Sequence, residues 1–195
     1  WDMFQNVKSI TGGKVSCQED PHTFEIMRTS HFMSCSTDVM ESYLKDLDAA
    51  AADGRNLLAE KYGWMMKSTM PEEFLKIEDL LPSPGLGQFN LIEKILHIEM
   101  EWYRELQEKY PCLIGRGRPL YSQKDSPAVT SVETYQRGEL LTYSLVTLGK
   151  YYSNRQVQKE ANLNGTEIIM LHMVQQYGYD SLEDAEEKIR NQNMH

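Results

Sequence analysis

Long hydrophobic runs are missing from this sequence. The apolar stretch from Ile168 to Val174 is short and is interrupted by His172, whereas a helix needs about 20 apolar residues to span a bilayer. We therefore expect no transmembrane segment. Basic residues are also few, since 20 Lys and Arg stand against 29 Asp and Glu and give a formal charge of −9. Nucleic acids and anionic membrane surfaces attract basic patches, so neither is an expected partner.

Cysteine is scarce as well. Cys17, Cys35 and Cys112 are widely spaced and form no CxxC pair, so neither a disulfide framework nor a zinc site is indicated. This usage is typical of a reducing compartment, and we expect a cytoplasmic protein. The Walker loop and the strings GxGxxG, GxSxG and HExxH are absent too, and no cofactor is predicted. No metal site is predicted either, because the one Glu-x-x-His string, Glu19 to His22, crosses a proline turn.

What the sequence does contain is helical periodicity. No alternating β pattern persists, and a hydrophobic content of 41% is enough for a sizeable core. We predict an all-α protein built from two related multi-helix halves around a shared core. The first pseudo-repeat covers residues 1–81, a Pro/Gly linker covers 82–88, and the second pseudo-repeat covers 89–195. Trp1 to Ile10 is predicted to be the end of a helix that Gly12-Gly13 stops.

An internal repeat appears when the chain is slid on itself by 109 residues (137 − 28). This shift places Arg28 on Arg137 and Tyr43 on Tyr152, and such self-similarity at one spacing is typical of repeated units. Two halves related by a pseudo-two-fold axis would turn both arginine helices towards a shared interior. Arg28 and Arg137 would then lie near the acidic residues predicted there.

The stretch from Thr130 to Ser144 carries the candidate site. Thr130 and Glu133 match a capping box, in which a hydroxyl caps free amides and a carboxylate three residues later reaches back. Steps of three or four residues then give an apolar stripe with one carboxylate in it, formed by Val132, Tyr135, Glu139, Tyr143 and Val146. Because a buried carboxylate must be paired or neutralised, this helix needs charged partners elsewhere.

A second carboxylate, Glu99, interrupts a similar stripe that runs from Phe89 to Tyr110. Glu99 and Glu139 are the candidate proton donors or acceptors, since burial raises the pKa of a carboxylate towards neutrality. Tyr143 or Tyr135 would assist them. The alternative is that the carboxylates are paired core residues and each tyrosine is a core aromatic residue with a satisfied hydroxyl.

The candidate ligand-binding residues are mostly basic. Arg28 and Arg137 would anchor an anion, and Arg116 and Arg118 would close over it from the long loop that follows Cys112, because a guanidinium presents a planar, charged fork. Alternatively, these arginines only neutralise the buried glutamates and lock the helices together.

Three further residues complete the predicted site. Glu133 stands four residues before Arg137, in the orientation that favours an ion pair. Tyr135 could orient a ligand or serve as a core aromatic residue. His31 shares a helix face with apolar residues, where a histidine is either a hydrogen-bonded core residue or a ligand contact.

Several strings, taken in order, resemble a bacterial family of unknown function, domain family four-one-two-five. They are WDMFQ, SCQEDPHTFEIMR, GRNLLAEKYGWMM, KYPCLIGRGRP, TSVETYQRGELLTYS and QYGYDSLEDAE. The resemblance covers nearly the whole chain and implies a helical, internally duplicated bacterial protein, found largely in anaerobes. It implies no activity, cofactor or catalytic residue. His31 stands where the family leads us to expect glutamine, so a role for His31 would be peculiar to this protein.

We therefore expect an enzyme or binding protein that recognises a small anionic metabolite at an interior polar site. The alternative is a non-enzymatic interaction or regulatory module, in which the arginines and glutamates pair only with one another. A concave pocket lined by these residues favours the first function, and a closed network of ion pairs without a cavity favours the second.

Overall fold

The structure is a computed structural model that describes residues 1–7 and 16–193. The described residues form helices and contain no β-strand, so the all-α class is confirmed. The helices are α1 (Asp2–Gln5), η1 (Ser16–Glu19), α2 (Pro21–Met33), α3 (Thr37–Ala52), α4 (Leu57–Thr69), α5 (Pro71–Phe74), η2 (Glu78–Leu80), α6 (Leu86–Lys109), α7 (Pro111–Gly115), η3 (Ser122–Lys124), α8 (Val132–Leu140), α9 (Leu145–Glu160), α10 (Gly165–Gln176) and α11 (Leu182–Gln192). The predicted helix stop at Gly12-Gly13 lies outside the described residues.

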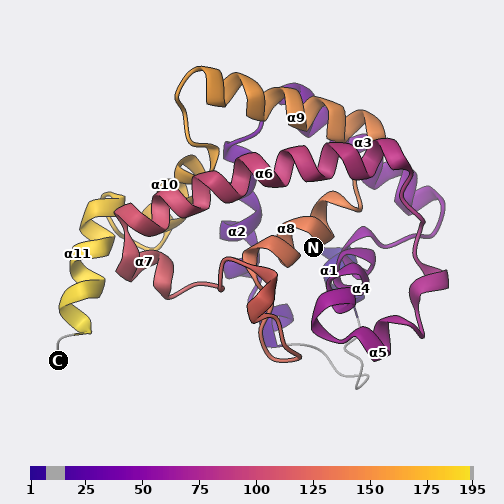
Figure 1. The fold of residues 1–195 in the computed structure, drawn as a ribbon, viewed down its shortest axis with the longest axis horizontal. Coiled ribbons are helices and arrows are strands. Elements are labelled where there is room, and N and C mark those ends of the chain that lie inside the picture. The colour runs from indigo at the N-terminus through magenta and orange to yellow at the C-terminus, as the bar shows by residue number, and fades with distance from the viewer. Residues whose placement is uncertain (8–15, 194–195) are drawn as a thin grey trace.

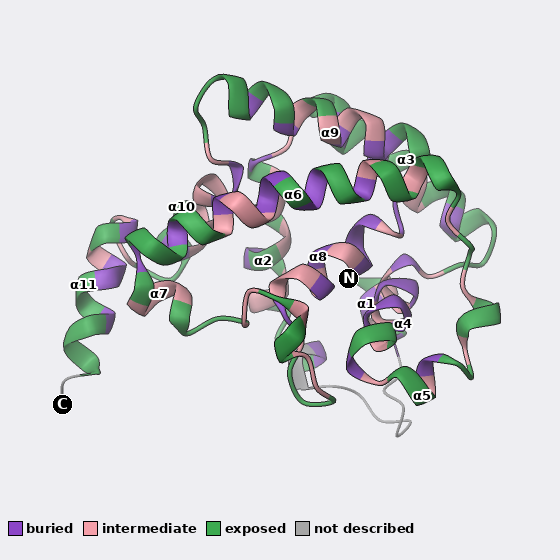
Figure 2. Ribbon diagram, viewed as in Figure 1, coloured by how far each residue is buried: buried purple, intermediate pink, exposed green. Residues whose placement is uncertain are grey.

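The long helix α6 organises the arrangement (Figure 1). Helices α3 and α9 pack together along one side of the molecule, and α6 packs on α9. Helices α2 and α8 occupy the middle, with α1, α4 and α5 at one end and α7, α10 and α11 at the other. Buried residues gather on the inward faces of these helices, as Figure 2 shows. None of the helices in the described ranges combines the length and the apolar character needed to cross a membrane.

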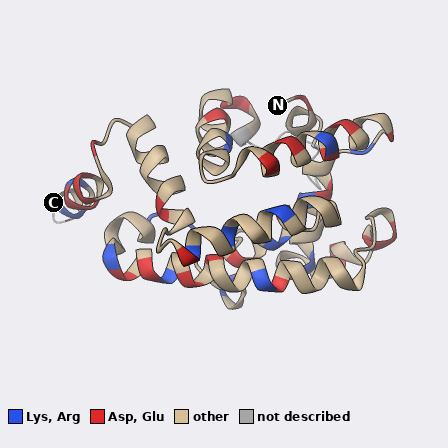
Figure 3. Cartoon of the chain, turned by 90° about the horizontal axis from the view of Figure 1, so that it is seen from above, with Lys and Arg blue, Asp and Glu red and all other residues tan. Residues whose placement is uncertain are grey.

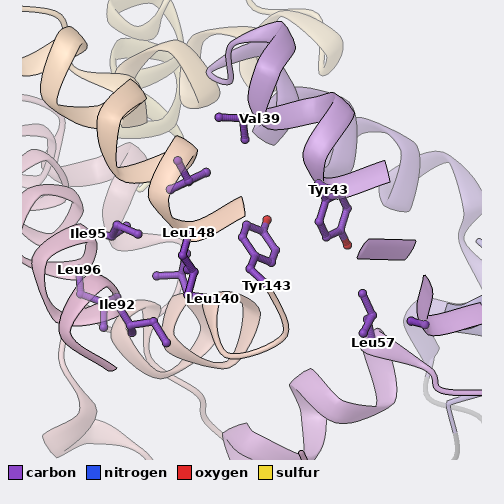
Figure 4. Close-up of a cluster of buried hydrophobic side chains, with 11 residues drawn as sticks. Val39, Tyr43, Leu57, Ile92, Ile95, Leu96, Leu140, Tyr143 and Leu148 are labelled. Carbon is purple, nitrogen blue, oxygen red and sulfur yellow. The ribbon is translucent and has the colours of Figure 1, made fainter. Parts of the chain in front are cut away.

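The main hydrophobic core draws on both predicted halves of the chain. Its buried members are Val39, Tyr43, Ala50, Leu57, Ile92, Ile95, Leu96, Leu140, Tyr143, Leu148 and Tyr151. In Figure 4, Tyr143 lies between Tyr43 on one side and the leucines of α8 and α9 on the other. The ring centroids of Tyr43 and Tyr143 are 4.9 Å apart. This cluster therefore ties α3 and α4 to α6, α8 and α9.

The helices of the two halves pack crosswise, and their caps recur at a constant separation. Helix α4 packs on α8, whereas α10 packs on α2. Asn56 and Asn164, which are 108 residues apart (164 − 56), each accept hydrogen bonds from two amides at the start of a helix. Gly54 and Asn162, also 108 apart (162 − 54), both have a positive φ, of 68° and 55°. These matches favour a separation of 108.

The separation of 108 changes which residues correspond. Ser36 and Ser144 precede α3 and α9 at the same interval (144 − 36). A separation of 108 matches Arg28 with Gln136. The separation of 109 predicts a match with Arg137 instead. Gln136 is buried and Arg137 is not. The duplication itself stays a prediction.

Helix α8 begins one residue later than the capping box predicts. The Ser131 hydroxyl accepts a hydrogen bond from the Thr134 amide at 3.2 Å, so Ser131 is the N-cap in place of Thr130. Glu133 does not reach back but accepts a hydrogen bond from a loop amide. Asp125 takes that place, since its Oδ1 accepts a hydrogen bond from the Ser131 amide at 2.6 Å. The long loop therefore supplies the carboxylate that fixes the start of α8.

Helix α8 lies against α4 at Gly138. A Cβ atom at this position would lie 2.9 Å from Cγ of Met65 and 3.0 Å from the carbonyl oxygen of Lys61. We expect Gly138→Ala to lower the free energy of unfolding by about 1–3 kcal/mol, because α8 would have to move away from the α4 backbone. Urea unfolding followed by circular dichroism measures this.

Gly149 in α9 provides the matched control, because a Cβ atom there would meet nothing within 4 Å. Gly149→Ala should raise the free energy of unfolding by about 0.5–1 kcal/mol, the usual gain in a helix interior. If Gly138→Ala and Gly149→Ala changed the free energy of unfolding equally, the close approach of α8 to α4 would be contradicted.

Candidate functional site

A cavity of about 650 Å³ lies among α2, α8 and α10, next to α7 and the loop that follows it. This volume is within the range of roughly 300–1,000 Å³ that small-molecule sites occupy. Helix α2 contributes Met27, Arg28 and His31 to its lining, and α8 contributes Val132, Tyr135, Gln136 and Glu139. Tyr103 of α6, Arg116 and Arg118 of the loop, and Ile169, Met170 and Met173 of α10 also line it.

Glu139 is a buried carboxylate in the lining of this cavity, and two cations contact it. Nη1 of Arg28 lies 2.8 Å from its Oε1, and Nζ of Lys61 lies 2.6 Å from its Oε2. Burial alone would raise the pKa of Glu139, but Arg28 and Lys61 outweigh burial and hold the pKa well below its usual range. The prediction that burial brings this pKa towards neutrality is therefore wrong. Glu139 is a fixed anion at pH 7.

Tyr135 lies beside two positive charges, that of Lys61 and that of Arg118. The ammonium nitrogen of Lys61 is 3.4 Å from the centre of its ring, and Cζ of the Arg118 guanidinium is 4.8 Å from it. Lys61 lowers the pKa of Tyr135 below its usual value, although burial acts in the opposite direction. The pKa values of Glu139 and Tyr135 thus shift in the direction that an excess of positive charge produces.

His31 lies next to Glu139 but stays uncharged. Burial, followed by the charge of Arg28, lowers the pKa of His31 to about 3. Its Nε2 is 3.5 Å from the Tyr143 hydroxyl, which in turn is 3.5 Å from Oε1 of Glu139. Burial and Glu139 raise the pKa of Tyr143 well above its usual value, so the hydroxyl keeps its proton. Tyr143 is fully buried in the core beside the cavity and supports His31 and Glu139.

The half-buried histidine, which stays neutral in the folded protein, makes stability depend on pH. The unfolded chain binds a proton at His31 near pH 6.5, whereas the folded chain does so only near pH 3, so the stability that the neutral ring supplies at pH 7 is lost as the pH falls. The free energy of unfolding should decrease by about 1 kcal/mol between pH 7 and pH 5.5 through this residue. In the His31→Gln variant the free energy of unfolding should not show this decrease. Urea unfolding at pH 7 and at pH 5.5 measures it.

His97 is the control for this prediction, since its side chain is 73% exposed on α6. His97→Gln should keep the pH dependence of the parent protein. A His31→Gln variant with the same pH dependence as the parent would show that His31 is not held neutral in the folded protein.

Arg116 and Arg118 are exposed residues that also line the cavity, so they lie at its entrance. Their loop is held against α8, because the Val132 amide donates a hydrogen bond to the Pro119 carbonyl oxygen at 2.8 Å. Nη1 of Arg118 donates to the Thr130 carbonyl oxygen, and Arg116 donates to a glutamine of α11. Within the described ranges, neither guanidinium forms an ion pair with a carboxylate.

Arg137 and Glu133 lie outside the cavity. Arg137 forms an ion pair with Glu93 of α6, lies 3.5 Å from Oε1 of Glu133, and has a side chain that is 35% exposed. Glu133 also accepts a hydrogen bond from the Ser122 amide, which fixes the loop. The expectation that Arg137 faces the same interior as Arg28 is therefore wrong. Arg137 takes part in pairing α8 with α6.

Glu99 belongs to a second buried network. Its Oε1 accepts hydrogen bonds from the Tyr151 hydroxyl at 2.7 Å and from Nε of Arg155 at 2.9 Å. Nη1 of Arg155 also donates to the Ser34 carbonyl oxygen at 2.9 Å. This network links α6 and α9 to the end of α2. Glu99 does not line the cavity, and the structure does not bring it together with Glu139.

A protein-family model covers most of the chain. The model described as "Protein of unknown function (DUF4125)" matches residues 1–187. The chain belongs to this family. No curated protein and no solved structure matches the chain. Membership in DUF4125 agrees with the resemblance carried by the motifs, and it supplies no activity. Across the described part of this DUF4125 protein, no group of three or more His, Cys, Asp or Glu side chains is placed to hold a metal ion.

Two buried cations of this DUF4125 protein are missing from the predicted site, although the sequence carries a signal for each. Lys61 stands between Leu57 and Met65 at intervals of four, so it interrupts an apolar stripe of α4 as Glu139 interrupts that of α8. Arg155 follows Tyr151 at the same interval. A charge that interrupts or ends an apolar stripe therefore marks both members of each of these two ion pairs.

Proposed function

We propose that the cavity binds a small organic anion. The observation that carries this proposal is the charge of the lining, where Arg28, Arg116 and Arg118 stand against the single carboxylate of Glu139, in a chain whose formal charge is −9. Because Glu139 accepts from Arg28, the two loop arginines remain for a ligand. Guanidinium groups suit carboxylates and phosphates, to which they donate paired hydrogen bonds.

The alternative function, an interaction module without a ligand, is favoured by a different observation. Arg28, Lys61 and Glu139 satisfy one another in a closed cluster, as a purely structural network would. The open cavity beside this cluster favours binding of a small molecule instead. In this proposal the cluster of Arg28, Lys61 and Glu139 holds α2, α4 and α8 together. The loop arginines, Arg116 and Arg118, contact the anion. If the ligand is also transformed, Tyr135 is better suited than Glu139 to exchange a proton.

Arg118→Ala tests the proposal. Titration calorimetry of the parent protein with inorganic phosphate and with carboxylates of two to ten carbons should reveal a binding anion. Arg118→Ala should weaken the binding of that anion about 10- to 100-fold, because a hydrogen bond from a charged group is lost. Little change in stability is expected, since Arg118 is exposed.

Arg104 supplies the control, as an exposed arginine of α6 that does not line the cavity. Arg104→Ala should bind the anion as the parent does. If Arg118→Ala and Arg104→Ala lost equal affinity for the anion, the interaction module would be favoured. The same holds if the parent protein binds no anion.

We also infer that the chain arose by duplication with a separation of 108 residues. The caps at Asn56 and Asn164 and the crosswise packing of α2, α4, α8 and α10 support it. Residues 31–69 should then superpose on residues 139–177. A superposition that fails to align α3 with α9 and α4 with α10 would contradict the duplication.

A further inference from the structure

Helix α10 has more apolar side chains than the protein covers. Its sequence runs Ile168-Ile169-Met170-Leu171-His172-Met173-Val174, but among these residues only Val174 is fully buried. The side chains of Ile169, Met170 and Met173 are half-buried and line the cavity. In Figure 3 the helix before the C-terminal one is almost free of charged residues. An apolar surface of α10 is therefore left facing the cavity.

The helices beside α10 add further apolar residues to the lining. Leu113 and Ile114 of α7 and Ile189 of α11 line the cavity, and α7, α10 and α11 lie together at one end of the molecule (Figure 1). The charged lining residues come instead from α2, α8 and the loop after α7. The apolar lining thus gathers on α7, α10 and α11, which we call the apolar end, and Arg116, which donates to a glutamine of α11, lies next to it.

Equivalent positions in two helices show how this apolar lining arises. Lys61 stands five residues after the cap Asn56, and Ile169 stands five residues after the cap Asn164. Lys61 extends from α4 to Glu139 of α8, whereas Ile169 extends from α10 into the cavity. One position is charged and its counterpart is apolar, so α10 presents an isoleucine to the cavity where α4 presents an ammonium group to Glu139.

We infer that the ligand is an amphipathic anion, with one carboxylate or phosphate group and an aliphatic or aromatic body. This inference rests on the proposed function and adds the class of ligand. The anionic group would meet Arg118 and Arg116 at the entrance, and the body would lie against Ile169, Met170 and Met173. Methionine side chains are flexible and polarisable, so they adapt to apolar bodies of different shape.

A series of straight-chain carboxylates from acetate to decanoate tests the inference on the parent protein. Each buried methylene should tighten binding about three- to fourfold until the apolar end is filled. Octanamide, which has the same apolar body without the charge, should bind at least tenfold more weakly than octanoate. Titration calorimetry gives both comparisons.

The outcomes separate the inference from the proposed function. If acetate or inorganic phosphate binds as tightly as octanoate, the proposed anion site is supported, and the inference that the ligand has an apolar body is refuted. If octanamide binds as tightly as octanoate, binding of an apolar body in the cavity is supported, and the proposed anion site is refuted. If no member of the series binds, both are refuted.

Substitutions in α10 give a second, independent test. Ile169→Gln should weaken octanoate binding about tenfold and leave any acetate binding unchanged. Leu171→Gln is the matched control, because Leu171 is an exposed residue of the same helix and does not line the cavity. Equal affinities for octanoate in the two variants would overturn the placement of the apolar body on α10. The carboxylate series remains decisive even if Ile169→Gln fails to fold.

Discussion

Glu139→Gln is expected to lower the free energy of unfolding by about 3–5 kcal/mol, the loss typical of breaking a buried ion pair. The amide would leave the charges of Arg28 and Lys61 facing each other in a buried site, without the carboxylate that both now contact. Urea unfolding at pH 7 measures the loss. Removing one of the two charges at the same time, in Glu139→Gln with Lys61→Met, should recover part of it.

The matched control for Glu139 is a more exposed ion pair between α8 and α6. Arg137 of α8 pairs with Glu93, whose side chain is 59% exposed, and Glu93→Gln should change the free energy of unfolding by less than about 1 kcal/mol. If Glu139→Gln costs no more than Glu93→Gln, the buried charge cluster does not hold α2, α4 and α8 together.

Arg155→Met is expected to cost a similar amount, about 3–5 kcal/mol. The substitution would leave Glu99 buried with the Tyr151 hydroxyl as its remaining partner. It would also remove the hydrogen bond from Arg155 to the Ser34 carbonyl oxygen, which joins α9 to the end of α2. Thermal and urea unfolding should both show the loss, with the helical signal at low denaturant unchanged.

Lys159→Met is the control for Arg155 because Lys159 lies on α9 and pairs with Glu101 at the surface. Its expected effect is below about 1 kcal/mol. A cost for Arg155→Met as small as that of Lys159→Met would mean that Glu99 is stabilised without a buried cation.

The helical class and several helix boundaries follow from the sequence because their causes are local. The Asp20-Pro21 pair predicts the start of α2, and the Asp20 side chain accepts a hydrogen bond from the Thr23 amide as an N-cap does. Periodicity likewise predicts that Val132, Tyr135 and Glu139 share a face, and all three line the cavity. Local patterns therefore identify which face of a helix turns inward.

The errors have two causes, an interaction that is distant in sequence and a helix end that the apolar stripe does not mark. Asp125 takes the capping role predicted for Glu133 from a loop position that no local pattern marks. Val146 is 66% exposed because α8 ends at Leu140 and a new helix begins at Leu145. The stripe that predicts Val146 in the core assumes one continuous helix, which the cap at Ser144 interrupts.

The misplacement of Arg137 has a geometric cause. Adjacent residues of a helix point about 100° apart, so a repeat register that is wrong by one residue turns the predicted side chain to another face. The separation of 109 pairs Arg28 with Arg137, whereas the caps favour 108 and pair it with Gln136, which does line the cavity. The sequence itself carries the separation of 108, which pairs Ser36 with Ser144 and Asn56 with Asn164, whereas the separation of 109 pairs the two arginines.

Methionine methyl groups offer the most direct test of binding in the cavity. The chain has 11 methionines; Met27, Met170 and Met173 line the cavity, whereas Met33 and Met40 are exposed elsewhere. In methyl NMR spectra of methionine-labelled protein, octanoate should shift the signals of Met27, Met170 and Met173 and leave those of Met33 and Met40 in place. Unchanged signals for the three cavity methionines at saturating octanoate would contradict the account.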